Sequence, residues 1–324
     1  IYVHSSSAGY LLSTQITCTK PVKWVIDNVV ITGPTSGWII ELQGNGSKIV
    51  GNGNAEFKLS TPSVPVVAAT LTATITGNVL TGVTITSGGS GYVTEPIAIF
   101  TGGGFTTPAM ILLTISGGAV NGYTILEAGT GYSSVPTISL LAGGAGAIHN
   151  LEPQNTELSN FRINMNSVAN AVGLYHYGGW YFDYHNIAIT RSDAHATAIG
   201  LSIDSHTNGV AGSTGSWGGA YVNNLSNIIT NVLCVVGHDT STSTTTTIRT
   251  IDCEKVILKA CIGFTFINPV VQKEGANIIL WDLTLARALT IIGGDYEGGG
   301  SGAVVYLFNG SGNTSLTSMN NVYV

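Results

Sequence analysis

Charged residues are scarce in this sequence. Lys and Arg number 11 and Asp and Glu 17, so that only 9% of the 324 residues carry charge, against roughly a quarter in an ordinary globular domain. So few cations, in a chain of net charge −6, cannot form the basic patch that binds nucleic acid or a polybasic membrane anchor. Because 44% of the residues are hydrophobic, the chain is not a disordered one either.

Long hydrophobic runs are also missing. No stretch approaches the roughly 18 uninterrupted apolar residues of a membrane-spanning helix, so we expect no membrane insertion. Gly, Ser, Thr and Asn supply the polarity that charge normally supplies, and helix surfaces normally rely on Glu, Lys and Arg. Abundant Thr, Val, Ile and Tyr favour strands. The composition therefore predicts an all-β protein.

The sequence contains no recognisable metal or redox motif. Cys18, Cys234, Cys253 and Cys261 form no C-x-x-C pair and have no His at zinc-finger spacing, so we expect buried thiols. No H-E-x-x-H motif, P-loop or nucleophile elbow is present. We therefore expect no metal site and no cofactor. The chain starts at Ile1 rather than Met and ends on a strand-like segment, which predicts a fragment or processed product with a truncated C-terminus.

A glycine-rich stretch from 72 to 148 contains one internal repeat. Residues 81–85 recur about 40 residues later at 121–125, and the Gly-Ser-Gly-Tyr segment 89–92 recurs as 129–132. Short alternating strands between glycine turns predict a compact two-unit β module. Its only carboxylates, Glu95 and Glu127, do not occupy matching positions, so we expect no catalysis there.

A second repeat has a period of about 26 residues. Its copies each begin near an Asn followed by apolar residues, at 27–31, 159–163, 185–189, 226–230, 276–280 and 320–324. A second strand correspondence relates 171–174 to 198–201 and, loosely, to 303–306. Two strands per repeat describe one coil of a parallel β-solenoid. Stacking of coils would place like residues in ladders, including hydrogen-bonded Asn ladders.

This pattern divides the chain into three parts. We expect N-terminal coils over 1–71, the glycine-rich insertion over 72–148, and the main coils over 149–324. The longer intervals from Asn186 to Asn227 and from Asn277 to Asn321 predict loops inserted on one side. Such insertions commonly build the binding face of a solenoid.

Several segments resemble the right-handed parallel β-helix proteins of the pectate-lyase-like class, and within it bacteriophage tailspikes. Residues 10–17 and 41–53 are similar to the first coils of such a helix, and 291–298 to a Gly-Gly-x-aromatic-Glu-Gly pattern of tailspike coils. The resemblance implies a homotrimer on the virion tail that attaches to the host by binding, and cleaving, a bacterial surface polysaccharide (capsule or lipopolysaccharide O-antigen). The calcium-binding acidic clusters and catalytic Arg of pectate lyases have no clear match here, nor has the paired Asp-Asp signature of polygalacturonases.

Glycoside hydrolysis needs two carboxyl groups, one donating a proton and the other acting as base or nucleophile. Glu157 precedes Asn160 by three residues, as Asp183 precedes Asn186, so we expect Glu157 and Asp183 to stack on neighbouring coils. Repulsion between stacked carboxylates favours an acid beside a base. The structural alternative is that both side chains point into solvent at a coil corner.

Three further carboxylates are candidate catalytic groups. Asp204 ends a predicted strand, where a turn Asp is the alternative. Asp295 and Glu297 lie at i and i+2, hence on one strand face, where a trimer contact is the alternative. The same spacing recurs in residues 252–254, where the adjacent Lys255 predicts a solvated ion pair.

Aromatic residues suggest where a sugar could bind, since sugar rings stack on aromatic planes. Residues 175–185 hold an unusual concentration of rings, and a later glycine- and serine-rich loop contains two more. A core stack with trimer packing is the alternative. The predicted substrate-binding residues are Tyr175, His176, Tyr177, Trp180, Trp217 and Tyr221.

Three functional hypotheses follow. A polysaccharide depolymerase is favoured, with a hydrolase preferred to a lyase because a lyase needs cations to hold a uronate, although His176 and Tyr177 could serve as its base. The second hypothesis is a fibre or adhesin that binds the polysaccharide without cleaving it. The third is a plant-cell-wall enzyme of the same fold.

Overall fold

The computed structural model describes most of the chain. The residues outside its description are 64–65, 152–153, 178–180, 191–196, 205–221, 237–242, 260, 274–277, 285, 287, 299–304, 312–315 and 321–324. Within the described residues every regular element is a strand, and none is a helix. The all-β composition prediction is therefore confirmed.

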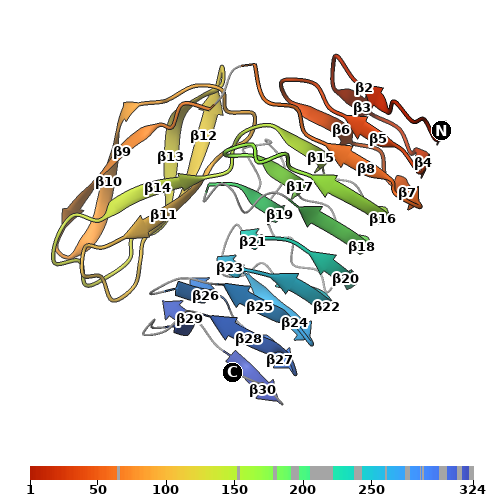
Figure 1. Cartoon of the computed structure of the whole chain (residues 1–324). Coiled ribbons are helices and arrows are strands. Elements are labelled where there is room, and N and C mark those ends of the chain that lie inside the picture. Colours follow the sequence, from red (N-terminus) through yellow and green to blue (C-terminus); the bar gives the residue numbers. More distant parts are fainter. Residues whose placement is uncertain are drawn as a thin grey trace.

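Two long, mostly parallel sheets run along the molecule (Figure 1). In the part of the chain that is described, the large sheet contains 15 strands and the small sheet nine. The large sheet consists of β1 (Tyr2–Val3), β2 (Tyr10–Leu11), β4 (Lys23–Asp27), β5 (Val30–Thr32), β7 (Lys48–Asn52), β8 (Glu56–Lys58), β16 (Glu157–Asn164), β18 (Asp183–Thr190), β20 (Val222–Ile229), β22 (Ser243–Cys253), β24 (Ile262–Ile267), β25 (Val270–Lys273), β27 (Leu289–Ile292), β28 (Asp295–Gly298) and β30 (Leu316–Asn320). The small sheet consists of β3 (Ile16–Cys18), β6 (Trp38–Leu42), β15 (Gly146–Leu151), β17 (Val172–Tyr177), β19 (Ile199–Asp204), β21 (Val232–Val236), β23 (Lys255–Lys259), β26 (Ile278–Thr284) and β29 (Val305–Ser311).

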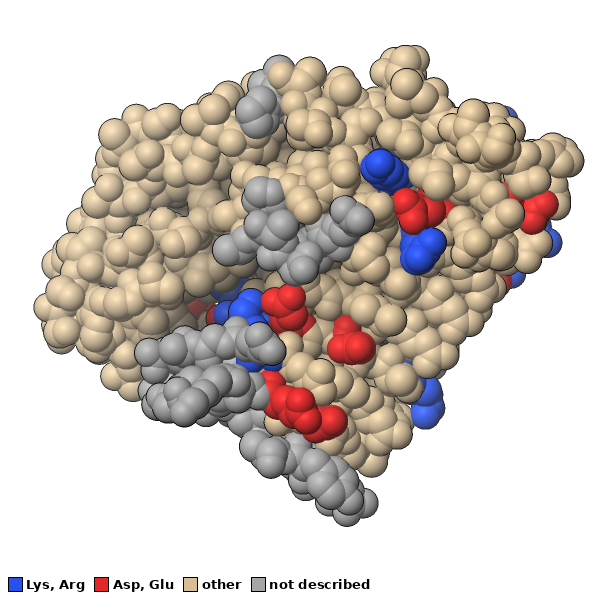
Figure 2. Space-filling view, in the orientation of Figure 1, with Lys and Arg blue, Asp and Glu red and all other residues tan. Residues whose placement is uncertain are grey.

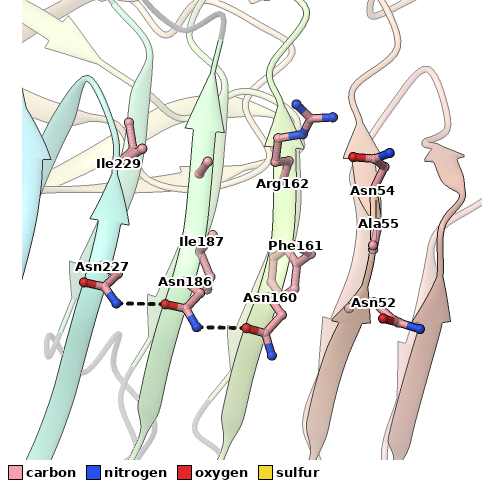
Figure 3. A pocket seen from close by; sticks show the side chains of 13 residues that line it. Asn52, Asn54, Ala55, Asn160, Phe161, Arg162, Asn186, Ile187, Asn227 and Ile229 are labelled. Carbon is pink, nitrogen blue, oxygen red and sulfur yellow. Dashed lines mark hydrogen bonds between the residues drawn. The ribbon is translucent and has the colours of Figure 1, made fainter.

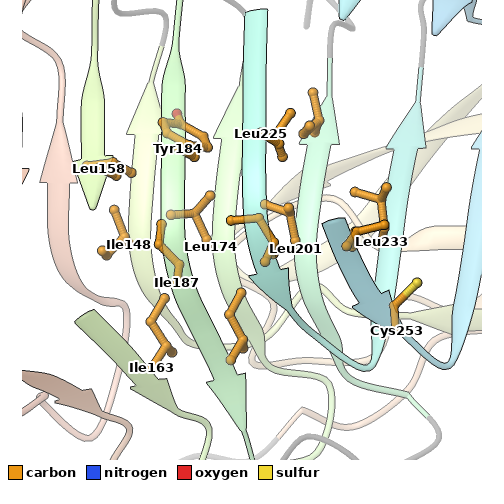
Figure 4. Close-up of a cluster of buried hydrophobic side chains, with 14 of the residues drawn as sticks. Ile148, Leu158, Ile163, Leu174, Tyr184, Ile187, Leu201, Leu225, Leu233 and Cys253 are labelled. Carbon is orange, nitrogen blue, oxygen red and sulfur yellow. The ribbon is translucent and has the colours of Figure 1, made fainter. Parts of the chain in front are cut away.

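The chain alternates between the two sheets, as expected for stacked coils. The 171–174 and 198–201 segments pair in the predicted register, Val172 with Ile199 and Leu174 with Leu201. All pairings within both sheets are parallel, an arrangement consistent with a β-solenoid. Alternating apolar side chains from the two sheets meet in one continuous core (Figure 4). Cys18, Cys234, Cys253 and Cys261 are free and buried, as predicted.

Asparagine marks a bend in the strands of the large sheet. Asn160, Asn186 and Asn227 have φ angles of 60°, 54° and 52°, in the left-handed region that Asn tolerates better than most residues. The bend lets residues on both sides of each Asn point into the core, as Leu158 and Phe161 do. The repeated Asn of the sequence therefore marks a left-handed backbone position, which Thr250 with φ of 53° fills on β22.

One predicted copy of the Asn repeat, residues 276–280, was assigned to the wrong sheet. Residues 278–280 belong to β26 of the small sheet, which pairs with β23 and β29, whereas the Asn bends lie in the large sheet. The equivalent bend residue is Asn268, with φ of 49°. Asn277 and Asn321, which bound the predicted longer interval, lie outside the described residues, as does most of the 320–324 copy. Apolar runs after Asn occur in both sheets, so sequence alone did not separate them.

The stretch between β8 and β15 forms a glycine-rich module with its own core. It contains β9 (Thr70–Thr76), β10 (Val79–Ser87), β11 (Ile97–Thr101), β12 (Met110–Ser116), β13 (Ala119–Glu127) and β14 (Thr137–Leu141), paired antiparallel as β9–β10, β12–β13 and β11–β14. The two hairpins are related by the predicted repeat. The Tyr of each Gly-Ser/Thr-Gly-Tyr segment plays the same part in both units. The Tyr92 hydroxyl oxygen accepts a hydrogen bond from the Ala69 N–H at 2.9 Å, and the Tyr132 hydroxyl oxygen accepts one from the Ala109 N–H at 2.6 Å.

Replacing Tyr132 with Phe is expected to destabilise the protein by about 1–3 kcal/mol. The Ala109 N–H is buried and would lose its acceptor, which costs its full desolvation penalty. Urea unfolding followed by fluorescence measures the change. Tyr10→Phe is the matched control because the Tyr10 ring is 42% exposed. Equal stability of both variants would contradict the structural role given to this motif.

The module packs on the outer surface of the small sheet. Ala142 and Leu141 of the module contact a cluster that includes Tyr175 and Tyr177 of β17. The buried Lys259 of β23 donates a hydrogen bond to the Ala98 carbonyl of β11 at 3.1 Å. The module thus covers one face of the small sheet, while the outer face of the large sheet near its Asn bends stays open.

Candidate functional site

A groove of about 590 Å³ lies on the outer face of the large sheet, along the line of Asn bends. Strands β7, β16, β18 and β20 contribute to it, together with the 52–55 connection that leads to β8. Figure 3 shows its side chains on neighbouring strands. The lining residues are Gly51, Asn52, Gly53, Asn54, Ala55, Asn160, Phe161, Arg162, Asn186, Ile187, Ala188, Asn227 and Ile229.

The amides of three Asn residues form a hydrogen-bonded ladder along the groove (Figure 3). The Asn227 Nδ2 donates to the Asn186 Oδ1 at 2.9 Å, and the Asn186 Nδ2 donates to the Asn160 Oδ1 at 2.9 Å. All three residues are exposed. The predicted Asn ladder is therefore confirmed here, and it faces outward, toward any molecule in the groove.

Apolar surface lies beside the ladder, with little net charge. Ile229 is 50% exposed, and Ala188 occupies the same row on the neighbouring strand. Arg162 is the one charged lining residue, and its guanidinium lies 3.6 Å from the Glu56 carboxylate. Amides beside an aliphatic strip can hydrogen-bond hydroxyls and contact the C–H faces of a sugar.

Glu157 and Asp183 are direct neighbours on β16 and β18, in the predicted register. They lie three residues before the Asn ladder on the same strands. Glu157 accepts a hydrogen bond from the Lys48 Nζ at 2.7 Å, and the Asp183 carboxylate lies 3.5 Å from the His185 Nδ1. Side-chain exposures of 31% and 53% keep both carboxylates accessible. The stacked pair is confirmed, and each carboxylate also has a basic neighbour.

Asp295 and Glu297 lie on one exposed face of β28, with Tyr296 buried between them. They are far along the large sheet from the groove, beyond β22 and β25. The ion pair expected between residues 252–254 and Lys255 was wrong. Lys255 lies 3.6 Å from Asp282 of β26, because β23 turns into the small sheet at this point. Glu254 instead pairs with Lys273 at 2.9 Å.

Of the six predicted sugar-binding residues, the three that the structure describes are buried. Tyr175 and Tyr177 are 6% and 8% exposed beneath the module. His176 is 2% exposed and points between the sheets, where its Nδ1 lies 2.6 Å from the Tyr184 hydroxyl. Asp204 ends β19 next to Tyr177 in register. Trp180, Trp217 and Tyr221 lie outside the described residues.

A second ionisable pair lies on the outer face of the small sheet. The His149 Nδ1 is 3.1 Å from the Glu41 carboxylate, and the His149 ring stacks on Trp38 at a centroid distance of 4.9 Å. The side chains of His149 and Glu41 are 11% and 15% exposed. The hydrogen bond from His149 lowers the pKa of Glu41 below its ordinary value, and burial opposes that shift only in part.

This pair predicts a loss of stability in acid. A carboxylate whose pKa is lowered by folding stabilises the protein above its unfolded pKa, and the contribution disappears as the pH falls through the folded value. The difference in unfolding free energy between wild type and Glu41→Gln should therefore shrink as the pH falls below about 4.5. Urea titrations across pH measure it, with the exposed Glu297→Gln as control. A difference that is independent of pH would refute the assignment.

Sequence reasoning missed the groove itself. It placed the Asn ladder correctly but treated it as scaffold, and it did not select Arg162 or Ile229. The available signal was an apolar residue at the outward position after an Asn bend, as at Ile229. The bend at Asn227 interrupts the simple alternation of inward and outward side chains along β20. The outward position of Ile229 could therefore be recognised only after the bend was known.

Two general features bear on the class of site. Within the described ranges, no group of three His, Cys, Asp or Glu residues is placed to hold a metal ion. No helix able to cross a membrane occurs among the residues that the structure describes. The fold and the groove define an all-β protein with two long parallel sheets and a polar, nearly uncharged outer groove.

Comparisons with known proteins include a weak similarity to a solved structure. No protein-family model matches the chain, and no curated protein matches it. Among solved structures, the chain is similar to the Gp54 tailspike of Acinetobacter baumannii bacteriophage AP22, solved in complex with an A. baumannii capsular saccharide, at 13% identity and a TM-score of 0.20. The similarity covers 99% of this chain and 62% of the tailspike chain. At this TM-score it carries no argument about function.

Proposed function

We propose that this chain binds a bacterial surface polysaccharide along the groove of the large sheet and cleaves it. The observation that carries the proposal is the outward Asn ladder with its exposed aliphatic strip, three residues from the stacked Glu157 and Asp183 carboxylates. Hydroxyl groups of a sugar match amides, and its C–H faces match aliphatic surface. Carboxyl groups on adjacent strands supply the pair that glycoside hydrolysis requires.

The roles of the two carboxylates follow from their neighbours. The Lys48 ammonium has donors only, so Glu157 interacts with it as an acceptor, which suits a nucleophile or base. Asp183 is then the proton donor to the leaving oxygen. Neighbouring strands lie about 4.8 Å apart, close to the carboxyl separation of about 5–5.5 Å in retaining glycosidases. We therefore propose a glycoside hydrolase, and a retaining one.

The assembly is proposed on the sequence resemblance to tailspikes. The two sheets would form a right-handed parallel β-helix, three copies of the chain would associate as a homotrimer, and the trimer would sit on a phage tail for host attachment. Analytical ultracentrifugation tests the trimer. In a trimer, Asp295 and Glu297 would contribute at subunit contacts, since both are exposed on β28.

Incubation with capsular polysaccharides and O-polysaccharides tests the activity. Release of reducing ends without absorbance near 235 nm supports hydrolysis, whereas absorbance at that wavelength indicates a lyase and rejects the hydrolase. Activity on pectin would point to a plant-cell-wall enzyme. The polysaccharides tested should include some with uronic acid and some without it. A lyase requires the uronic acid, whereas a hydrolase does not.

A binding-only fibre is the second candidate. The 2.7 Å ion pair between Lys48 and Glu157 favours it, since a carboxylate held by a Lys can serve to stabilise the pairing of β7 with β16. Binding of a polysaccharide that is not shortened, as judged by size-exclusion chromatography, would support this candidate and reject cleavage.

A further inference from the structure

We infer that the groove selects an electrically neutral segment of polysaccharide and reads it through the Asn ladder, one coil at a time. The inference rests on the proposed function and concerns the chemical class of the ligand. It makes Asn186, the middle residue of the ladder, a specificity-determining residue. Carboxylate-bearing sugars are the class that the groove should reject.

The charges around the groove argue against an anionic ligand. Arg162 is the only cation lining the groove, and Glu56 already accompanies it at 3.6 Å. Glu157 and Asp183 lie on the same strands, just before the ladder. Lys48 of β7 is paired with Glu157 at 2.7 Å, and Arg249 of β22 is not among the lining residues. A uronate in the groove would meet no unpaired cation among the lining residues, and two carboxylates lie three residues away along the same strands. Figure 2 shows that charged side chains on the face it draws occur in small groups separated by uncharged surface.

The hydrogen-bonding groups that the ladder leaves unused favour a neutral ligand. An Asn amide has two N–H donors and an oxygen with two lone pairs. In Asn186 the ladder uses one donor toward Asn160 and one lone pair toward Asn227. Unused donors and lone pairs recur along the three Asn residues of the ladder, about every 4.8 Å across the sheet. A row of paired donors and acceptors suits neutral hydroxyl and acetamido groups, which both donate and accept.

The direction of the ladder follows from the same contacts. Amides that hydrogen-bond across strands form a line perpendicular to the strands, and Ile229 and Ala188 form a parallel aliphatic row beside it. A polysaccharide would therefore lie across the strands. Successive sugar residues would contact successive coils, with C–H faces on the aliphatic row.

Asn186→Gly is the decisive variant. Glycine adopts the φ of 54° at this position without strain, so the change removes the amide and preserves the bend. Asn268→Gly is the matched control, because Asn268 occupies the same kind of bend, with φ of 49°, outside the groove lining. Melting temperatures of both variants show whether they are folded equally well.

Binding is measured by calorimetry with neutral polysaccharides, uronate-containing polysaccharides and the carboxyl-reduced forms of the latter. We expect neutral and reduced forms to bind, Asn186→Gly to raise their Kd about three- to tenfold, and Asn268→Gly to leave it unchanged. The Kd should vary little between about 0.05 M and 0.5 M salt, since a neutral ligand is not screened.

The outcomes separate the inference from the proposed function. If no polysaccharide binds to the wild type, the proposed function fails. If a uronate-containing polysaccharide binds at least as tightly as its reduced form, and Asn186→Gly weakens it, the groove is a polysaccharide site and the neutral-ligand inference is overturned. Binding that neither glycine variant affects would place the site outside the ladder and overturn the inference as well.

Discussion

Replacing Glu157 with Gln, or Asp183 with Asn, is expected to lower the rate of polysaccharide cleavage by about 10²–10⁴-fold. The two carboxylates are register neighbours on β16 and β18, and each change removes one of the two groups that hydrolysis requires. Both substitutions preserve side-chain size, so binding in the groove should be little affected. The rate is measured as reducing ends released per minute at saturating polysaccharide.

Asp252→Asn is the matched control for these variants. Asp252 is exposed at the end of β22 in the same sheet, outside the groove, and should leave the rate unchanged. Full activity of both Glu157→Gln and Asp183→Asn would remove this pair from the mechanism. In that case Asp295→Asn and Glu297→Gln are the next variants to assay, because those carboxylates share an exposed face of β28.

Replacing Phe57 with Ala is expected to destabilise the protein by about 3–5 kcal/mol. Phe57 is fully buried and meets the Phe161 ring edge-on at a centroid distance of 5.4 Å, directly beneath the groove. Removing the ring leaves a cavity that strands held on both sides by parallel pairing cannot close. Guanidinium unfolding monitored by circular dichroism measures the loss.

Two variants bracket this result. Phe57→Leu keeps most of the buried volume and should cost less than the Ala variant. Leu11→Ala, at a position 78% exposed, should change stability by no more than about 0.5 kcal/mol. Similar losses for Phe57→Ala and Leu11→Ala would show that the core between the two sheets does not govern stability.

Much of the coil register could be predicted because it is a property of repetition. When similar segments stack, equivalent residues must pair, and the pairings of Val172 with Ile199 and of Glu157 with Asp183 followed from spacing alone. The equivalence of Tyr92 and Tyr132 followed in the same way. The 276–280 copy failed because an Asn before an apolar run occurs in both sheets, and only pairing distinguishes them.

The candidate site could be predicted only in part. The stacked carboxylates and the Asn ladder are local consequences of the repeat, but the exposure of a side chain depends on what else covers its face. Tyr175 and Tyr177 looked suitable for sugar stacking, yet the glycine-rich module folds over them. No spacing rule indicates which face of a solenoid an insertion will cover.

By itself, the sequence determined the all-β class, much of the parallel pairing register and the low charge, because strand propensity and repetition act locally. The tertiary structure alone decided which face remained open. The left-handed bends at Asn160, Asn186 and Asn227 turned their amides outward, and packing of the module closed the opposite sheet. Which face stays open depends on contacts between residues distant in the chain. The free energy of those contacts cannot be read from any single segment of the sequence.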